Sequence, residues 1–517
     1  MKLNWKLFAP LVVAIIVWLI GAPEGLSANS WIYVSIFAGL VVGLILEPMP
    51  PAFIGIIAVT VSMLFKVGPA PVVDKATGVA KAITDAQAIS WGLSGFSNAI
   101  VWLIFAAFMI GIGYENSGLG RRIALFLVAK LGKSSLGLGY AIAITDLVLA
   151  PFIPSNAARS GGTIYPIVSS ICPMFDSYPD KNPRKIGSYL NWVALATTCV
   201  SSSIFLTGAA PNPLALELSA KSGIVAANWG TWFLAFLPVG LILFIITPLL
   251  TYVFCKPEVK GSPEIAAWAK DEYKKLGSMT RSEIFMALIS VLALVLWIGA
   301  STFKVNPTTT ALIVIILMIF TKIMTWQDFL ANKPAWNVLT WFATLVPMAS
   351  GLKNVGFLDW LAKSAGGSLV SLDPTMAVLG LLLAFCLLRY FFASGTAYVT
   401  AMVGLFATLI LQIPGVDPAQ VMLILLVPMG IMGILTPYGT GHSPIWFASG
   451  YNKGPEFWKL GAIFGIIYLA HSPIWFASGY NKGPEFWKLG AIFGIIYLAI
   501  FIVVGIPWIQ FVMPLLG

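Results

Sequence analysis

The stretch Pro154-Ser155-Asn156-Ala157-Ala158-Arg159 is a polar interruption between two apolar runs. The whole segment, residues 136–175, is LGLGYAIAITDLVLAPFIPSNAARSGGTIYPIVSSICPMF, and basic residues flank it: Lys133 before it, and Lys181, Arg184 and Lys185 after it. Basic residues collect on the cytoplasmic side of membrane proteins. If both flanks are cytoplasmic, the segment enters the membrane and returns as a re-entrant hairpin with a polar tip. Such irregular backbone is tolerated at membrane depth only where protein or a water-filled cavity satisfies it.

A second polar stretch, Phe392-Ala393-Ser394-Gly395-Thr396-Ala397, lies in a similar apolar frame in the other half of the chain. The distribution of Lys and Arg predicts a second hairpin at 375–411, which enters from the opposite face. Two such interruptions in corresponding places indicate the substrate site of a transporter.

The composition is that of a polytopic, all-α membrane protein. The chain has 517 residues, of which 59% are hydrophobic and 10% charged, and its mean hydropathy is +0.91. A soluble chain carries about 25% charged residues. The net charge of +10 is spread through short loops, which favours membrane topology over nucleic-acid binding. The four cysteines form no CxxC pair, so we expect no disulfide framework, metal site or cofactor.

Ten mostly apolar runs are candidate membrane spans, and a last one follows near the C-terminus. The ten runs are Leu7–Ile20, Trp31–Leu46, Pro51–Phe65, Ser97–Gly113, Ser188–Leu206, Trp229–Phe254, Ile284–Ala300, Thr309–Phe320, Trp336–Met348 and Val421–Leu435. With the N-terminus inside, the predicted inside loops hold more Lys and Arg than the outside loops. We expect residues 1–30 to hold an uncleaved span, because no small-x-small cleavage site is clear.

A polar linker at 256–283, predicted to form a short cytoplasmic surface helix, divides the chain into two halves. The first half, 31–255, contains the first hairpin and then a span broken at 207–212 (TGAAPN). The second half, 284–517, contains the second hairpin and a span broken at 436–441 (TPYGTG). The halves start on opposite faces, which predicts inverted repeats that alternate access around a midplane site.

The second half also holds a tandem duplication, since residues 442–470 recur without a change at 471–499. An identical copy of 29 residues differs from a solenoid repeat, which would diverge and recur more often. It indicates a recent in-frame duplication or an artefact of sequence assembly. We assign the first copy to the site because it follows the 436–441 break directly. The apolar run of the first copy is short, so the total is 11 or 12 spans and the side of the C-terminus stays open.

The tips and breaks supply the predicted substrate-binding residues. Helix N-termini present free N–H groups and a partial positive charge, which suit an anion, and neutral side chains can add hydrogen bonds to a carboxylate. The predicted set is Ser155, Asn156, Arg159, Thr207, Asn212, Ser394, Gly395, Thr396, Thr436 and Thr440. The alternative for each is a helix cap or a small packing residue, which are common in membrane bundles.

Two arginines and a histidine lie close to these motifs. Arg159 is expected to contact a substrate carboxylate with its planar fork, and the alternative is an ion pair with Asp146 on the other arm of the hairpin. For Arg389 we favour snorkelling to the membrane interface. For His442 we favour capping or packing over titration near neutral pH, and its copy His471 is expected to have no role.

These residues resemble the divalent anion/sodium symporter family, in particular its branch of citrate/succinate and tartrate/succinate antiporters and plastid oxoglutarate/malate translocators. The matching stretches are LILEPMP, SGFSNAIVWLIFAAFM, GYENSGLGRRIALFLV, APFIPSNAARSGGTIYPI, LTGAAPNPL, RYFFASGTAYVTA, GILTPYGTG and EFWKLGAIFG. The resemblance implies a bacterial inner-membrane transporter with a dimerising scaffold domain and an elevator-like transport domain that holds both hairpins. It also implies that both tips bind the substrate's carboxylates, together with sodium in the coupled members.

The tips depart from the family's Ser-Asn-Thr pattern. The first reads Ser155-Asn156-Ala157 and the second Ser394-Gly395-Thr396, so each lacks one oxygen ligand of the kind that a hard cation needs. A fixed positive charge such as Arg159 could take the place of sodium. Together with the resemblance to the antiporter branch, this favours exchange of C4-dicarboxylates for a di- or tricarboxylate over sodium symport. If transport is coupled to sodium, the expected ligands are Ser155, Asn156, Ser394 and Thr396.

Two other classes of protein are weaker alternatives. Gly92-Leu93-Ser94-Gly95 matches the GxSG of intramembrane serine proteases, with His442 as a candidate base. Four common residues match easily by chance, and a motif counts only in its structural context. A channel or a receptor would need a ring of charged residues or a soluble sensing domain, and the sequence suggests neither.

Overall fold

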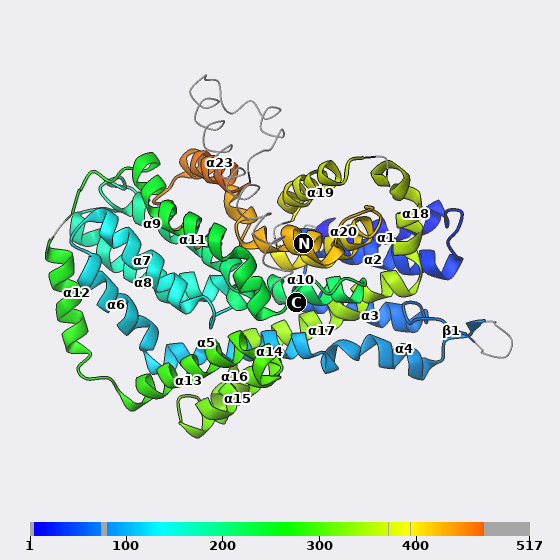
Figure 1. Cartoon of the computed structure of the whole chain (residues 1–517), viewed down its shortest axis with the longest axis horizontal. Coiled ribbons are helices and arrows are strands. Elements are labelled where there is room, and N and C mark those ends of the chain that lie inside the picture. The colour runs from blue at the N-terminus through cyan, green and yellow to red at the C-terminus, as the bar shows by residue number, and fades with distance from the viewer. Residues whose placement is uncertain (1–4, 74–79, 262, 371, 393, 470–517) are drawn as a thin grey trace, which may run out of the picture. The chain divides into compact units, whose positions relative to one another are not determined.

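The computed structural model describes residues 5–73, 80–261, 263–370, 372–392 and 394–469 (Figure 1). Within these ranges the chain is almost wholly helical, and the one sheet pairs the strands β1 (Val72–Val73) and β2 (Ala80–Lys81) antiparallel. The predicted all-α class is therefore confirmed. The second copy of the duplication and the predicted last span lie outside the described residues.

Contacts divide the chain into two compact units. Unit 1 comprises residues 1–105, 213–226 and 333–425, and unit 2 comprises 106–212, 227–332 and 426–517. Each unit takes segments from both halves of the sequence, so the compact units are not the predicted repeats. The inverted repeat itself stays a prediction.

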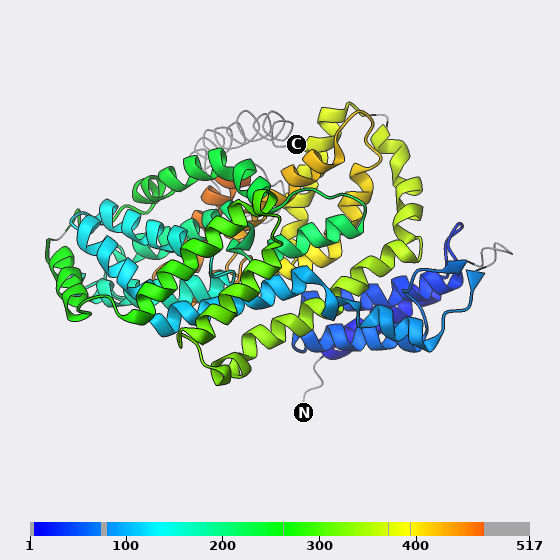
Figure 2. The ribbon, with the colours of Figure 1, turned by 60° about the horizontal axis from the view of Figure 1, so that its bottom comes forward.

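Unit 1 is built on close helix packing. Its helices are α1 (Trp5–Ile20), α2 (Ala28–Leu46), α3 (Pro51–Leu64), α4 (Asp85–Gly92), η1 (Ser94–Ser97), α17 (Lys333–Asn354), α18 (Phe357–Val370), α19 (Pro374–Leu388), η5 (Arg389–Phe391), α20 (Gly395–Ile410) and most of α10 (Pro211–Lys221) and α21 (Pro418–Leu426). The helices α1, α2 and α3 lie side by side, in blue in Figures 1 and 2. Gly39 of α2 lets the backbones meet, since a Cβ there would lie 2.9 Å from the Pro10 carbonyl oxygen of α1. Small residues allow this close approach in membrane bundles.

Unit 2 is organised around α9 (Gly187–Ile204), all of whose residues are buried. Its other helices are α6 (Leu119–Leu131), α7 (Ser135–Leu149), η2 (Ala158–Ile164), α8 (Tyr165–Ile171), η3 (Cys172–Phe175), η4 (Leu206–Gly208), α11 (Trp229–Phe254), α12 (Pro263–Lys275), α13 (Arg281–Ile298), α14 (Ala300–Phe303), α15 (Pro307–Phe320), α16 (Trp326–Ala331), η6 (Val427–Gly430), η7 (Met432–Leu435), α22 (Ser443–Ala448) and α23 (Gly454–Leu469). The helix α5 (Ala99–Ser117) begins in unit 1 and continues into unit 2. Packed on α9 are α7, α11, α22 and η6, and a helix covered on all sides is a core helix.

The ten predicted spans all fall on helices. The agreement is complete for α11, whose bounds Trp229–Phe254 equal the predicted ones. The last predicted span continues beyond α21 as the 3-10 turns η6 and η7. Five described helices are long and apolar enough to cross a membrane, and the other apolar helices are shorter. The helix in the linker is present as α12, which packs on α6. The number of crossings stays a prediction.

Both predicted hairpins are interrupted helices. In the first, α7 ends at Leu149, and the chain becomes helical again within the tip stretch, where the π-helical turn η2 begins at Ala158 and leads into α8. In the second, α19 and η5 precede the tip and α20 follows it. Helix, break and helix therefore occur at both predicted places, while their insertion from opposite faces stays a prediction.

Candidate functional site

The first tip is attached to the first break within unit 2. The Pro154 carbonyl accepts a hydrogen bond from the Ala210 N–H (3.2 Å), and the Thr207 hydroxyl donates to the Pro151 carbonyl (2.7 Å). Ser155 caps the turn after the tip, because its hydroxyl oxygen accepts from the Ala158 N–H (3.2 Å). The first tip and the first break are therefore in direct contact.

Arg159 is fully buried and makes five hydrogen bonds. Its Nε donates to Asp146 Oδ1 at 3.0 Å. The other donors reach the carbonyls of Ile153 (2.7 Å) and Gly208 (2.9 Å) and the hydroxyls of Ser201 and Ser202 (3.1 Å each). A guanidinium has five N–H donors, so none is left for a substrate in this conformation. The favoured expectation of a carboxylate contact is corrected, and the alternative, the Asp146 ion pair, is present.

Asp146 completes a polar network inside unit 2. Its carboxylate also accepts from the hydroxyls of Thr198 (3.1 Å) and Ser201. Ser160 extends the network to α22, because it contacts the Thr198 hydroxyl (3.2 Å) and accepts from the Trp446 indole N–H (2.8 Å). A buried ion pair is stable only when such hydrogen bonds satisfy its remaining atoms. The sequence analysis missed these α9 hydroxyls, although the run TTCVSSS at 197–203 is conspicuous in an apolar helix.

The second break also reaches the first tip. A Cβ on Gly441 would lie 2.9 Å from Oδ1 of Asn156, so the backbone of the break lies against the tip amide. The Thr440 hydroxyl contacts Nδ1 of His442 at 3.1 Å. Thr436 is buried, and its hydroxyl has no hydrogen-bond partner among the described residues.

Asn212, in the first break, bonds to one carbonyl just before the end of α9 and to one just after it. Its side-chain amide donates to the carbonyls of Ser202 (2.7 Å) and Phe205 (3.2 Å). This bonding satisfies the free carbonyls where α9 ends. Unit 2 thus brings together seven of the predicted residues: Ser155, Asn156, Arg159, Thr207, Asn212, Thr436 and Thr440.

His442 is a packing residue, as expected. It is fully buried, and its Nε2 lies 3.1 Å from the Leu195 carbonyl of α9. His471, its copy, lies outside the described residues.

The other predicted residues, Ser394, Gly395 and Thr396, belong to unit 1. Ser394 caps α20, because its hydroxyl oxygen accepts from the Ala397 N–H (3.4 Å). Gly395 is the first residue of α20, and Thr396 is buried in its first turn. These contacts fit the cap alternative, and whether the same residues bind a substrate stays a prediction.

Arg389 does not snorkel. It is only 4% exposed, and it donates to the Phe392 carbonyl (2.6 Å). Its guanidinium carbon also lies 5.7 Å from the ring centroid of Tyr398, which is a cation–π contact. The expectation of an interfacial side chain is therefore wrong, because this arginine is buried and its guanidinium contacts Phe392 and Tyr398.

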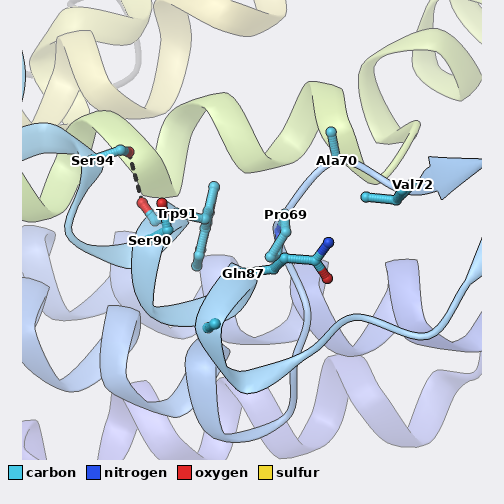
Figure 3. Close-up of a pocket in the computed structure, with 8 residues that line it drawn as sticks. Pro69, Ala70, Val72, Gln87, Ser90, Trp91 and Ser94 are labelled. Carbon is cyan, nitrogen blue, oxygen red and sulfur yellow. Dashed lines mark hydrogen bonds between the residues drawn. The ribbon is translucent and has the colours of Figure 1, made fainter.

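Among the described residues that line its pocket, the Ser94 motif has no catalytic partner. Ser94 is exposed, and its hydroxyl donates to the Trp91 carbonyl (2.7 Å). It lines a pocket of about 450 Å³ together with Pro69, Ala70, Val72, Ala86, Gln87, Ser90 and Trp91 (Figure 3). None of these side chains is a base, and a serine nucleophile needs one. Among the described residues there is also no group of three metal-ligand side chains.

Comparisons with known proteins agree with the transporter interpretation. The chain is 45% identical over 469 residues to the citrate/succinate antiporter of Escherichia coli K12, covering 90% of this chain and 96% of that protein. It is 42% identical over 466 residues to the L-tartrate/succinate antiporter of Escherichia coli O157:H7, covering 90% and 95%. The fold is similar to that of the YdaH transporter of Alcanivorax borkumensis, with a TM-score of 0.50 and 14% identity over 89% of this chain and 99% of that one.

The family comparison decides between the classes of protein considered. The family profile described as "Sodium:sulfate symporter transmembrane region" matches residues 1–471. The match extends through the first copy of the duplicated segment and ends at its boundary with the second. The chain is therefore a multi-pass membrane transporter, not an enzyme, and it belongs to the sodium:sulfate symporter family.

Proposed function

We propose that this protein is an antiporter that exchanges C4-dicarboxylates such as succinate for a second di- or tricarboxylate across the bacterial inner membrane. Citrate, tartrate, malate and 2-oxoglutarate are the candidate counter-substrates. The observation that carries the proposal is the meeting of the first tip with both breaks in unit 2, where Asn156 lies against Gly441. Two relatives above 40% identity are named for exchange of succinate against another carboxylate.

The site supplies neutral hydrogen-bonding groups. Ser155 and Asn156 are half-buried at the first tip, so a ligand can reach them. Thr207 and Asn212 hold the first break in place through their own hydrogen bonds. The second tip, in unit 1, offers neutral groups of the same kind at Ser394, Gly395 and Thr396. An elevator movement of a transport domain in a homodimer would expose the site to the two sides in turn.

Sodium-coupled dicarboxylate symport is the second candidate, and two observations favour it. Asp146 offsets the charge of Arg159, so this arginine does not replace a cation as the sequence suggested. Thr436 also has a buried hydroxyl oxygen without a hydrogen-bond partner among the described residues, and hard cations take oxygen ligands.

Uptake of labelled succinate into proteoliposomes tests both candidates. The vesicles are empty or loaded with succinate, citrate, tartrate or 2-oxoglutarate, each with and without a sodium gradient. Exchange predicts uptake only into loaded vesicles, unaffected by sodium. Sodium-driven uptake into empty vesicles would overturn the exchange mechanism and establish the symporter.

The duplication needs its own control, because residues 472–499 fall beyond the family match. A variant that lacks 471–499 keeps the copy that joins the 436–441 break. We expect its exchange rate to equal or exceed that of the full chain. Loss of exchange on this deletion would show that transport requires the duplicated segment.

A further inference from the structure

The ring of His442 joins two parts of unit 2, and its protonation follows from its partners. Its Nε2 lies 3.1 Å from the Leu195 carbonyl oxygen, which can only accept, so Nε2 carries a hydrogen. A fully buried imidazole favours the neutral form. Nδ1 then has no hydrogen and accepts a hydrogen bond from the Thr440 hydroxyl at 3.1 Å.

The Thr440 hydroxyl is saturated by this arrangement. A hydroxyl has one hydrogen and two acceptor positions. The hydrogen is donated to His442, one acceptor position takes the Ser443 N–H (3.1 Å), and the other takes the Ser443 hydroxyl (2.6 Å). Thr440 therefore contributes to the site through the position of its backbone, and not through a free hydroxyl.

Gly441, the residue after Thr440, shows which contact depends on the position of the Thr440 backbone. Gly441 lies between Thr440 and His442, and its Cα lies so close to Asn156 that an added Cβ would be 2.9 Å from Oδ1. We infer that His442 is a positioning residue: it bridges the Leu195 carbonyl to the Thr440 hydroxyl and so holds the second break against the first tip. The inference rests on the proposed function, since it assigns to His442 the geometry of that same site.

A double-mutant cycle tests the bridge. His442→Gln keeps an N–H that can donate to Leu195, but its carbonyl oxygen leaves the same carbon as this nitrogen and does not point to Thr440 as Nδ1 does. Thr440→Val removes the hydroxyl from the other side. Each single variant is expected to raise the KM for succinate exchange about three- to tenfold at nearly constant kcat. The double variant should be no worse than the worse single variant, because both changes break one contact, and Thr440→Ser should restore the wild-type KM. Multiplied effects in the double variant would overturn the bridge.

The duplication provides a matched control. His471 begins the same sequence as His442, HSPIWFASG, but follows Leu469-Ala470 and not Thr440-Gly441, so His471→Gln is the same substitution without the threonine partner. It should leave the KM unchanged. An equal rise in KM for His471→Gln would overturn the assignment to His442.

A second measurement does not depend on transport. Asn156→Cys places a thiol at the half-buried tip, and the four native cysteines are buried. His442→Gln is expected to change its rate of maleimide labelling about threefold or more, and His471→Gln is expected to leave the rate unchanged. A labelling difference in a protein without carboxylate exchange would keep the inference and reject the proposed function. Equal labelling rates would reject the inference.

Discussion

The two hairpin tips each carry a buried arginine, but different parts of the chain hold the two side chains. Arg159 is bound by Asp146 from its own hairpin, by two serines of α9 and by Gly208 of the first break. Arg389 donates to Phe392 and lies over Tyr398, both in its own hairpin. The first tip is thus tied to a core helix and to a break, so its arginine sets a tertiary position. Through Phe392 and Tyr398, Arg389 joins η5 to α20 across the second tip.

The largest loss of stability is expected for Asp146→Asn. The change leaves the Arg159 charge buried without its counter-charge, and breaking a buried pair in this way costs about 3–5 kcal/mol. Thermal denaturation of the purified protein, followed by tryptophan fluorescence, measures the loss. The exposed Asp180→Asn is the control and should change stability by less than about 0.5 kcal/mol. Equal effects of the two variants would contradict the buried ion pair.

Arg389→Met is expected to lower stability less than Arg159→Met. It removes the cation–π contact with Tyr398 and the hydrogen bond to Phe392, for a loss of about 1–3 kcal/mol. Arg389→Lys keeps the charge near the ring and should recover part of the loss. Both arginine variants are compared in the same denaturation experiment. A loss for Arg389→Met as large as that for Arg159→Met would end the distinction between a tertiary and a local role.

The same comparison explains what the sequence could predict. Helices were predictable because long apolar runs in a membrane chain are helical, and Trp229–Phe254 was predicted at its observed bounds. The partner of Arg159 could only be left as two alternatives. Choosing between them requires knowing that α9 places Ser201 and Ser202 beside the tip, and that placement is tertiary. The burial of Arg389 was missed for the same reason, since a side-chain direction cannot be read from spacing.

The contact between the first tip and the second break gives a third test. Gly441→Ala places a methyl group against Asn156 Oδ1, so the amide must turn away. Loss of its hydrogen bond to a carboxylate is expected to raise the KM for succinate about three- to tenfold. The control lies in the second hairpin, where a Cβ on Gly380 would meet nothing within 4 Å. Gly380→Ala should leave the KM unchanged, and a similar rise in both variants would indicate a general effect of glycine replacement.

The smallest effects are expected on replacing the two capping serines. These variants distinguish a serine that only caps a helix from one that also binds the substrate. Ser155 and Ser394 each accept a hydrogen bond from the N–H three residues ahead (3.2 and 3.4 Å). Replacing a capping serine by alanine costs about 0.5–2 kcal/mol of stability. If the serines are caps alone, Ser155→Ala and Ser394→Ala lower thermal stability by this amount and leave the KM for succinate unchanged. If they also bind the carboxylates, the KM for succinate rises as well. We expect this rise at both tips, because a hydroxyl oxygen can accept the capping hydrogen bond while its hydrogen is donated to the substrate. A rise at Ser155 alone would restrict the binding site to the first tip, and the second tip would then be a structural element only.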